Sequence, residues 1–213
     1  MKVFKIWADF DFRSLFPYEP EDPRYDELVD ESLSLGRSTA WSERWSRTPV
    51  HSDSESSPIG NFAHIWGLED FAIDDRAYEV LHPIFSDCCE FLPFLPYQGK
   101  DFYWMNVLTI VDCLDHERTK QKIGKSGKPF GKIEEYHFAP AQFTKATLFR
   151  VPKQVTLLTL TGTSHPQTEF KTLVERLGFT GLSFEEIWSE DGPPVKARGL
   201  SDILRDKSRK LRH

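Results

Sequence analysis

The segment from Cys88 to Val111 constrains the fold most, because its pattern is that of two strands joined by a tight turn. Cys88–Leu95 and Asp101–Val111 are rich in aromatic and β-branched residues, which favour an extended backbone. Between them, Tyr97–Lys100 has the sequence YQGK, whose glycine suits a turn. We therefore expect a β-hairpin here, against which the other elements must pack.

A helix is predicted shortly before this hairpin. Apolar residues recur at positions i, i+3, i+4 and i+7, which places them on one face of a helix from about Asp75 to Phe85. This stripe consists of Ala77, Val80, Leu81 and Ile84. Phe71–Ile73 precedes the helix as a short strand, and either Asp74 or Asp75 can cap the helix N-terminus. Pro83 falls in the last turn, so we expect a short or kinked end.

Residues 157–187 repeat the order strand, helix, strand. Pro166 suits the first turn of the second helix, and Gly178 stands where a glycine commonly follows a helix C-terminus. The apolar stripe of this helix consists of Phe170, Leu173, Val174 and Leu177. Leu182–Trp188 is the last predicted strand. Because residues 71–94 have the same order, we expect two similar β-α-β pieces contributing to one sheet.

Together these elements predict an α+β fold. We expect a mixed, mostly antiparallel sheet of about six to eight strands, with two main helices packed on it. The further strands of this sheet are predicted at Val3–Trp7, Ile133–Phe138, Thr147–Val151 and Val155–Leu160.

A length of 213 residues fits one large domain or two small ones. The patterning sharpens from Pro58, which predicts an irregular acidic N-terminal segment (1–57), an α+β domain (58–192) and a basic C-terminal tail (193–213). Within the N-terminal segment we expect a short helix at about Tyr25–Leu33 and an exposed, serine-rich loop at residues 51–57.

The composition indicates a cytoplasmic protein. No apolar run approaches the roughly 20 residues of a membrane helix, and Asp9 and Asp11 interrupt the N-terminus before a signal-like stretch forms. Three cysteines, two of them adjacent (Cys88 and Cys89), favour reduced thiols over disulfides. Neither a CxxC motif nor a paired-histidine spacing occurs, so we expect no metal site and no cofactor.

Charge is distributed unevenly along the chain. Residues 1–60 carry 7 Lys/Arg against 12 Asp/Glu, residues 61–117 carry 2 against 11, and residues 118–213 carry 18 against 10. The two halves of the chain could face each other and compensate. Alternatively, the first half could present an acidic surface to a basic partner.

Two stretches raise alternative functions. Asp112, Asp115, His116 and Glu117 could hold a divalent metal or act as acid and base, as in a metal-dependent hydrolase using Asp112, Asp115 and His116. They could equally form a charged turn at a strand end, which we favour, so we do not expect an enzyme. The basic segment 118–132 could bind nucleic acid, but its one aromatic is Phe130 and the whole chain is acidic. We therefore expect a solvated, flexible loop there.

The sequence DFYWMNVLTIVDCLD, residues 101–115, resembles a bacterial family of polymorphic-toxin immunity proteins, family eleven in that nomenclature. Shared features are an aromatic pair, an Asn-Val pair and a Val-Asp-x-Leu-Asp run. The resemblance extends over about residues 58–188. It includes the motifs HFAP at residues 137–140 and GFTGLSF at residues 178–184.

This resemblance implies a cytosolic inhibitor that binds a cognate toxin domain and performs no chemistry of its own. The motif residues are interpreted as structural: Asn106 and Asp112 should tie neighbouring loops by hydrogen bonds. The contact surface should then lie in the unmatched parts of the chain, because partner specificity is set by variable surface.

The densest acidic run lies in the unmatched N-terminal segment, and we expect it to bind the toxin, which could be a basic, nuclease-like domain. Two tryptophans just beyond this run could supply the apolar anchors that dominate interface energies. The predicted contact residues are Glu21, Asp22, Asp26, Glu27, Asp30, Glu31, Trp41 and Trp45. The alternative is a solvated helix face with both tryptophans in the core.

Overall fold

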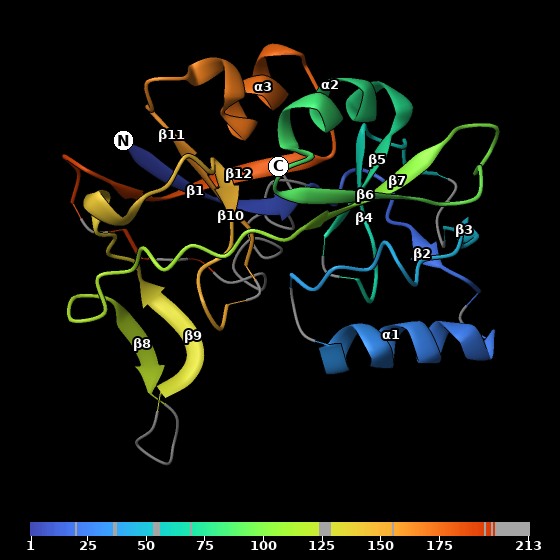
Figure 1. The fold of residues 1–213 in the computed structure, drawn as a ribbon, viewed down its shortest axis with the longest axis horizontal. Coiled ribbons are helices and arrows are strands. Elements are labelled where there is room, and N and C mark those ends of the chain that lie inside the picture. Colours follow the sequence, from blue (N-terminus) through green and yellow to red (C-terminus); the bar gives the residue numbers. More distant parts are fainter. Residues whose placement is uncertain are drawn as a thin grey trace, which may run out of the picture.

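The computed structural model of the chain describes residues 1–19, 21–35, 38–52, 56–68, 70–123, 129–154, 156–193, 195–196 and 198, with the backbone alone at 32–35 and 129–132. Figure 1 shows two four-stranded sheets side by side, with two helices together on one face. A third helix and a two-stranded hairpin lie on the opposite side. The predicted α+β class is confirmed.

The first sheet has the strand order β4-β5-β7-β6, and every neighbouring pair is antiparallel. Its elements are β4 (Phe62–His64), β5 (Phe71–Asp74), α2 (Asp75–Phe85), β6 (Cys89–Pro93) and β7 (Phe102–Val107). The helix α2 connects β5 to β6, which run parallel to each other with β7 between them. The predicted hairpin is therefore present as β6 and β7, joined through the turn at Tyr97–Lys100.

The second sheet has the order β10-β11-β1-β12, again with antiparallel neighbours. Its elements are β1 (Lys2–Ala8), β10 (Leu148–Phe149), β11 (Leu158–Thr161), α3 (Phe170–Arg176) and β12 (Leu182–Ser189). The helix α3 connects β11 to β12, and β1 lies between these two strands. Both sheets thus share one arrangement, in which a β-α-β unit encloses an antiparallel strand.

Two expectations about organisation are wrong. The repeated β-α-β units form two sheets rather than one, because each unit encloses its own central strand, β7 or β1. The N-terminal residues are also not an addition to a domain that begins at residue 58. Val3 and Ile6 of β1 are buried, so the first strand of the chain completes a sheet whose other strands lie beyond residue 147.

One core fills the space between the two sheets and the helices α2 and α3. Phe62 of β4 contacts Phe170 of α3 at a ring-centroid distance of 5.8 Å, and Phe170 contacts Phe85 of α2 at 5.7 Å. The predicted stripes face this core. Ala77, Leu81, Phe170, Leu173 and Val174 are buried in it, and Val80, Ile84 and Leu177 are half-buried against it. Phe85, outside the predicted stripe, is buried there as well. Packing of these stripes holds both helices on the same face.

The ends of the helices follow the local signals in part. Asp74 caps α2, its carboxylate accepting a bond from the Ala77 amide. Pro83 lies inside the last turn of α2, which still continues to Phe85. Pro166 begins a separate 3-10 turn, Pro166–Thr168, so α3 starts only at Phe170. Gly178 follows α3 with a φ of +64°, as predicted for a residue after a helix C-terminus.

The opposite faces of the sheets are covered by segments with little regular structure. Beneath the first sheet lie Trp41 and the pair β2 (Phe16–Pro17) and β3 (Val50–His51), which precede and follow α1 (Pro23–Leu35). The predicted helix is therefore present and longer than expected. Val50–His51 is a strand, whereas residues 53–55 of the predicted loop lie outside the described residues.

The basic segment 118–132 was expected to be a flexible loop. The structure instead has a hairpin, β8 (Lys120–Ile123) paired with β9 (Pro129–Glu135), which extends away from the sheets in Figure 1. Residues 124–128 lie outside the described part. The strand expected at residues 133–138 ends at Glu135, and the chain then turns so that Phe138 bridges Leu114.

No helix in the described ranges is both long and apolar enough to cross a membrane.

Candidate functional site

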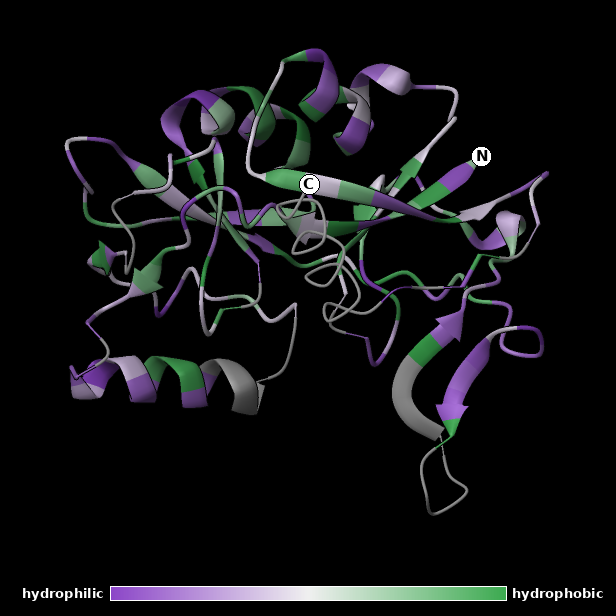
Figure 2. Ribbon diagram, turned by 180° about the vertical axis from the view of Figure 1, so that it is seen from behind, coloured by the Kyte–Doolittle hydropathy of each residue, from purple (hydrophilic) through white to green (hydrophobic). Residues whose placement is uncertain are grey.

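The helix α1 presents its acidic residues on one face and its apolar residues on the other. At 3.6 residues per turn, positions 26, 27, 30 and 31 share one side, and positions 25, 28 and 29 share the other. The apolar side packs on the turn between β4 and β5, where a Cβ added to Gly67 would lie 2.5 Å from Val29 Cγ2. Figure 2 shows the helix hydrophilic over most of its length, with one hydrophobic band.

Two of the predicted contact carboxylates are compensated by arginines. Asp22 accepts hydrogen bonds of 2.9 and 3.1 Å from Arg24 Nε, and these bonds lower the pKa of Asp22 to about 2. Glu31 pairs with Arg44 Nη1 at 3.2 Å. These two carboxylates are therefore less available to a partner than their neighbours.

The other predicted carboxylates are exposed and have no ion-pair partner among the described residues. Glu21, Asp26, Glu27 and Asp30 are all exposed, and across the described ranges none of them has a basic side chain within ion-pair distance. Three of these four lie on α1 itself. The helix thus carries a concentrated negative charge on an exposed side, where Glu31 pairs with Arg44.

The two predicted anchors pack against the first sheet, and Trp41 is too deeply buried to contact a partner. Trp41 is only 4% exposed and packs against Trp104 at a centroid distance of 5.7 Å. Trp45 donates its Nε1 hydrogen to the Pro93 carbonyl at 2.8 Å and lies 5.3 Å from Trp104. Trp41 is part of the core beneath the first sheet, as the alternative interpretation held, and Trp45 is half-buried against that core. Their i, i+4 spacing indicated that both rings lie on the same face of the segment, but it did not indicate whether that face is buried or exposed.

Asn106 is the buried tie that the motif predicted. Its Nδ2 donates to the Thr39 carbonyl at 2.9 Å and to Glu90 Oε2 at 3.0 Å. Glu90, opposite it on β6, also accepts from the amides of Trp41 at 2.7 Å and Ser42 at 3.0 Å. Burial alone would raise the pKa of Glu90, but these hydrogen bonds outweigh it and leave that pKa below its ordinary value. The pair therefore fastens residues 39–42, and with them Trp41, to the sheet.

An exposed aromatic group adjoins α1, and the sequence reasoning missed it. Trp66 is 43% exposed and stacks on Phe16 at 5.8 Å and 15°. Phe16 in turn stacks on His51 at 5.2 Å and 27°. We call these three rings the aromatic stack. Because Gly67 lies under α1, the stack is next to the helix. The sequence signal that could have revealed this exposed ring is Trp66 directly before the turn residue Gly67.

The cluster once considered for metal or acid–base chemistry is a charged turn. His116 Nε2 lies 3.0 Å from Asp112 Oδ1, with both side chains well exposed. Asp115 Oδ1 accepts from the amides of Glu117 at 3.2 Å and Arg118 at 3.1 Å, as a turn-capping aspartate does. Over the residues that the structure describes, no three potential ligands converge on one point. Asp112 pairs with His116 instead of tying a neighbouring loop.

Comparison with known proteins gives no assignment. No protein-family model matches the chain, and no curated protein matches it. The features of the chain that bear on function are the motif in residues 101–115 and the surface around α1.

Proposed function

We propose that the chain is a cytoplasmic immunity protein, which binds a cognate bacterial toxin domain and neutralises it without catalysis. The resemblance of residues 101–115 to such proteins supports this class. The observation that carries the proposal is the exposed acidic face of α1, formed by Asp26, Glu27 and Asp30, for which the described residues supply no ion-pair partner.

The acidic face suits a toxin with a basic active site, as a nuclease-like domain would have. Carboxylates can stand where the phosphates of a nucleic acid would bind and so block the site. Such a surface also steers association, because opposite charges raise the encounter rate well before contact. The steering falls off over about 10 Å at 0.1 M salt.

The aromatic stack supplies the apolar contact that Trp41 and Trp45 cannot. Trp66 is the exposed ring of this stack, and Phe16 beneath it holds the indole in place. Tryptophans with preordered rings are frequent among the few residues that dominate interface energies. Trp66 beside the acidic helix would accordingly slow dissociation, while the carboxylates speed association.

The proposal is tested by binding kinetics with a candidate toxin domain. The first step is to determine whether the neighbouring gene encodes a large secreted protein, whose C-terminal domain is then the candidate. The test variant carries Asp26→Lys, Glu27→Lys and Asp30→Lys. Its matched control carries Glu79→Lys, Asp87→Lys and Asp101→Lys, three exposed acids away from α1 that give the same net charge. We expect the association rate to fall at least tenfold in the test variant alone, together with loss of its salt dependence.

Thermal unfolding of both variants shows whether they remain folded. Growth of cells that express the toxin domain reports protection. If the test variant still protects cells and binds with unchanged, salt-insensitive kinetics, the interface lies elsewhere on the molecule. If the native chain neither binds the domain nor protects cells, the proposed function is wrong.

A further inference from the structure

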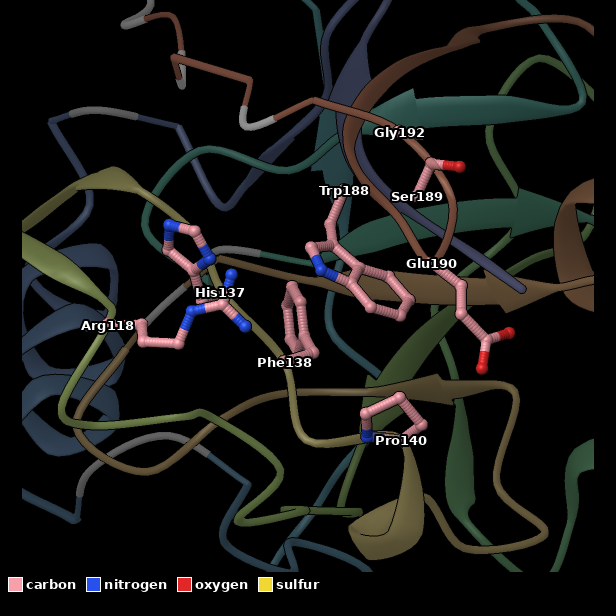
Figure 3. A pocket seen from close by; sticks show the side chains of 8 residues that line it. All are labelled: Arg118, His137, Phe138, Pro140, Trp188, Ser189, Glu190 and Gly192. Atoms are coloured by element: carbon pink, nitrogen blue, oxygen red, sulfur yellow. The ribbon is translucent and has the colours of Figure 1, made fainter.

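A cavity of about 170 Å³ opens at the C-terminal end of β12 (Figure 3). It shares no residue with α1 or with the aromatic stack. The walls come from three separate parts of the chain: the turn before β8, the segment that follows β9, and the end of β12. The lining residues are Arg118, His137, Phe138, Pro140, Trp188, Ser189, Glu190 and Gly192.

Two aromatic rings form the apolar wall. Phe138 and Trp188 lie 5.7 Å apart at 66°. Phe138 is 3% exposed and stacks between Tyr136 and Phe143, each at 5.8 Å. Phe143 also contacts Trp188 at 6.0 Å. Because Phe138 is stacked on two neighbours and almost fully buried, it can offer the cavity only its ring edge, and the half-buried Trp188 supplies the larger apolar surface.

A cation stands at one end of the cavity. Figure 3 shows the Arg118 side chain next to His137, with Phe138 and Trp188 beyond them. The Arg118 amide is held by Asp115. Within the described chain, however, no acceptor binds its guanidinium. Glu190 also lines the cavity, but it pairs with the N-terminal ammonium at 3.0 Å. Among the described residues that line the cavity, the charged side chain without an ion-pair partner is therefore the positive Arg118.

His137 adds a fixed polar edge. Only 6% of this residue is exposed, and its Nε2 lies 2.7 Å from Glu135 Oε1. Lys120 pairs with the same carboxylate at 2.9 Å. Since Glu135 can only accept, Nε2 is the protonated nitrogen, and the carboxylate fixes the orientation of the ring. Glu135 thus binds both His137 and Lys120, and the Arg118 guanidinium can bind the anion of a ligand.

We propose that this cavity binds a small planar aromatic carboxylate, with its ring against Phe138 and Trp188 and its carboxylate on Arg118. The size fits, because a cavity of about 150 Å³ holds one benzene ring. The chemistry fits as well, since a guanidinium binds a carboxylate through two parallel hydrogen bonds. Aromatic walls favour a flat ring over a puckered one of similar size.

The test titrates the full chain with benzoate, followed by ligand-observed NMR and calorimetry. Two matched probes separate the contributions: cyclohexanecarboxylate keeps the charge without the flat ring, and benzyl alcohol keeps the ring without the charge. We expect benzoate to bind with a Kd of about 10 mM or tighter. This value corresponds to a binding free energy of about 0.3 kcal/mol per non-hydrogen atom, which is a low ligand efficiency. Each matched probe should bind at least fivefold more weakly.

Arg118→Gln should weaken benzoate at least tenfold and leave benzyl alcohol unchanged. Arg118 is exposed and its guanidinium has no partner in the described chain, so this variant should fold normally. Arg176→Gln, an exposed arginine on α3, is the matched control and should bind benzoate as the native chain does. Absence of benzoate binding overturns the proposal. Equal binding by Arg118→Gln, or equal binding of cyclohexanecarboxylate, overturns it as well.

Discussion

At the scale of single residues, polar side chains inside the fold determine where irregular segments attach. Glu90 and Asn106 face each other on β6 and β7, and together they bind Thr39, Trp41 and Ser42. A buried polar group is tolerated only when its bonds are satisfied. The segment that carries Trp41 is therefore held in place by an amide and a carboxylate as well as by its indole ring.

Glu90→Gln tests this attachment. The substitution keeps the shape of the side chain but removes its charge. An amide NH2 group replaces one carboxylate oxygen, so it faces the donors of Trp41, Ser42 or Asn106. We expect a loss of about 1–3 kcal/mol in the free energy of unfolding at pH 7, measured in urea. Glu79→Gln on the exposed side of α2 is the matched control and should change the stability little.

The same variant carries a pH signature. The pKa of Glu90 in the folded chain is below its ordinary value of 4.5. The stabilisation from its charge is therefore complete above pH 4.5 and is lost as the pH falls through the folded pKa. The difference between native chain and Glu90→Gln should thus shrink below pH 4.5. A difference that stays constant down to pH 3 would mean that the charge of Glu90 contributes nothing.

At the scale of elements, an apolar stripe stabilises each of the two β-α-β units, and the helix of the first unit also has a side-chain N-cap. In the first unit, Asp74 both ends β5 and caps α2. Its second oxygen accepts from Asn61 Nδ2 at 2.8 Å, and Asn61 Oδ1 accepts from the Thr180 amide at 3.1 Å. One carboxylate thereby connects the start of α2 to the chain just before β12.

Asp74→Ala should destabilise the protein by about 1–2 kcal/mol, since it removes the N-cap and leaves Asn61 without its acceptor. Asp74→Asn retains a capping oxygen and should recover most of this loss. Asp75→Ala removes an exposed acid from the same helix turn and should cost no more than about 0.5 kcal/mol. Thermal unfolding followed by circular dichroism measures all three. Equal losses for Asp74→Ala and Asp75→Ala would refute the capping role.

At the scale of the whole molecule, a buried ion pair joins the two sheets. Arg150 directly follows β10, and Asp70 directly precedes β5; their side chains are paired and each residue is at most 2% exposed. Arg150 Nη1 also donates to the Val107 carbonyl at 2.8 Å, and Asp70 Oδ2 accepts from the Val107 amide at 3.2 Å. The end of β7 is thus held by both partners.

Arg150→Met should lower the free energy of unfolding by about 3–5 kcal/mol, because it leaves the Asp70 carboxylate buried without a counter-charge. The double variant Arg150→Met with Asp70→Asn removes that charge and should recover part of the loss. Urea unfolding of the native chain, both single variants and the double variant forms the required cycle. If the double variant is no more stable than Arg150→Met, the loss arises from packing and not from the uncompensated charge.

Local patterns predicted many of the elements correctly, because their signals act over one or two helical turns. The bounds of α2, the strands β1 and β12 and the hairpin β6–β7 all follow from nearby residues. The same signals limited the cap of α2 to Asp74 or Asp75, and the structure has Asp74. The acidic face of α1 was predictable for the same reason. Errors occurred where a distant contact outweighs local preference. The predicted strand over residues 101–111 ends at Val107, since the Val111 amide bonds instead to Arg150.

The sequence by itself determined the fold class, the two β-α-β units and which faces of their helices must be buried. Only the tertiary structure decided what covers those faces. Hydrophobic periodicity indicates which face of a helix is buried, but it does not indicate which residues pack against that face. It decided that β1 completes a sheet formed 150 residues later. It also decided that Trp41 is buried while Trp66 is exposed, and that Arg118, Phe138 and Trp188 meet around one cavity. Each of these outcomes depends on contacts between residues far apart in the chain.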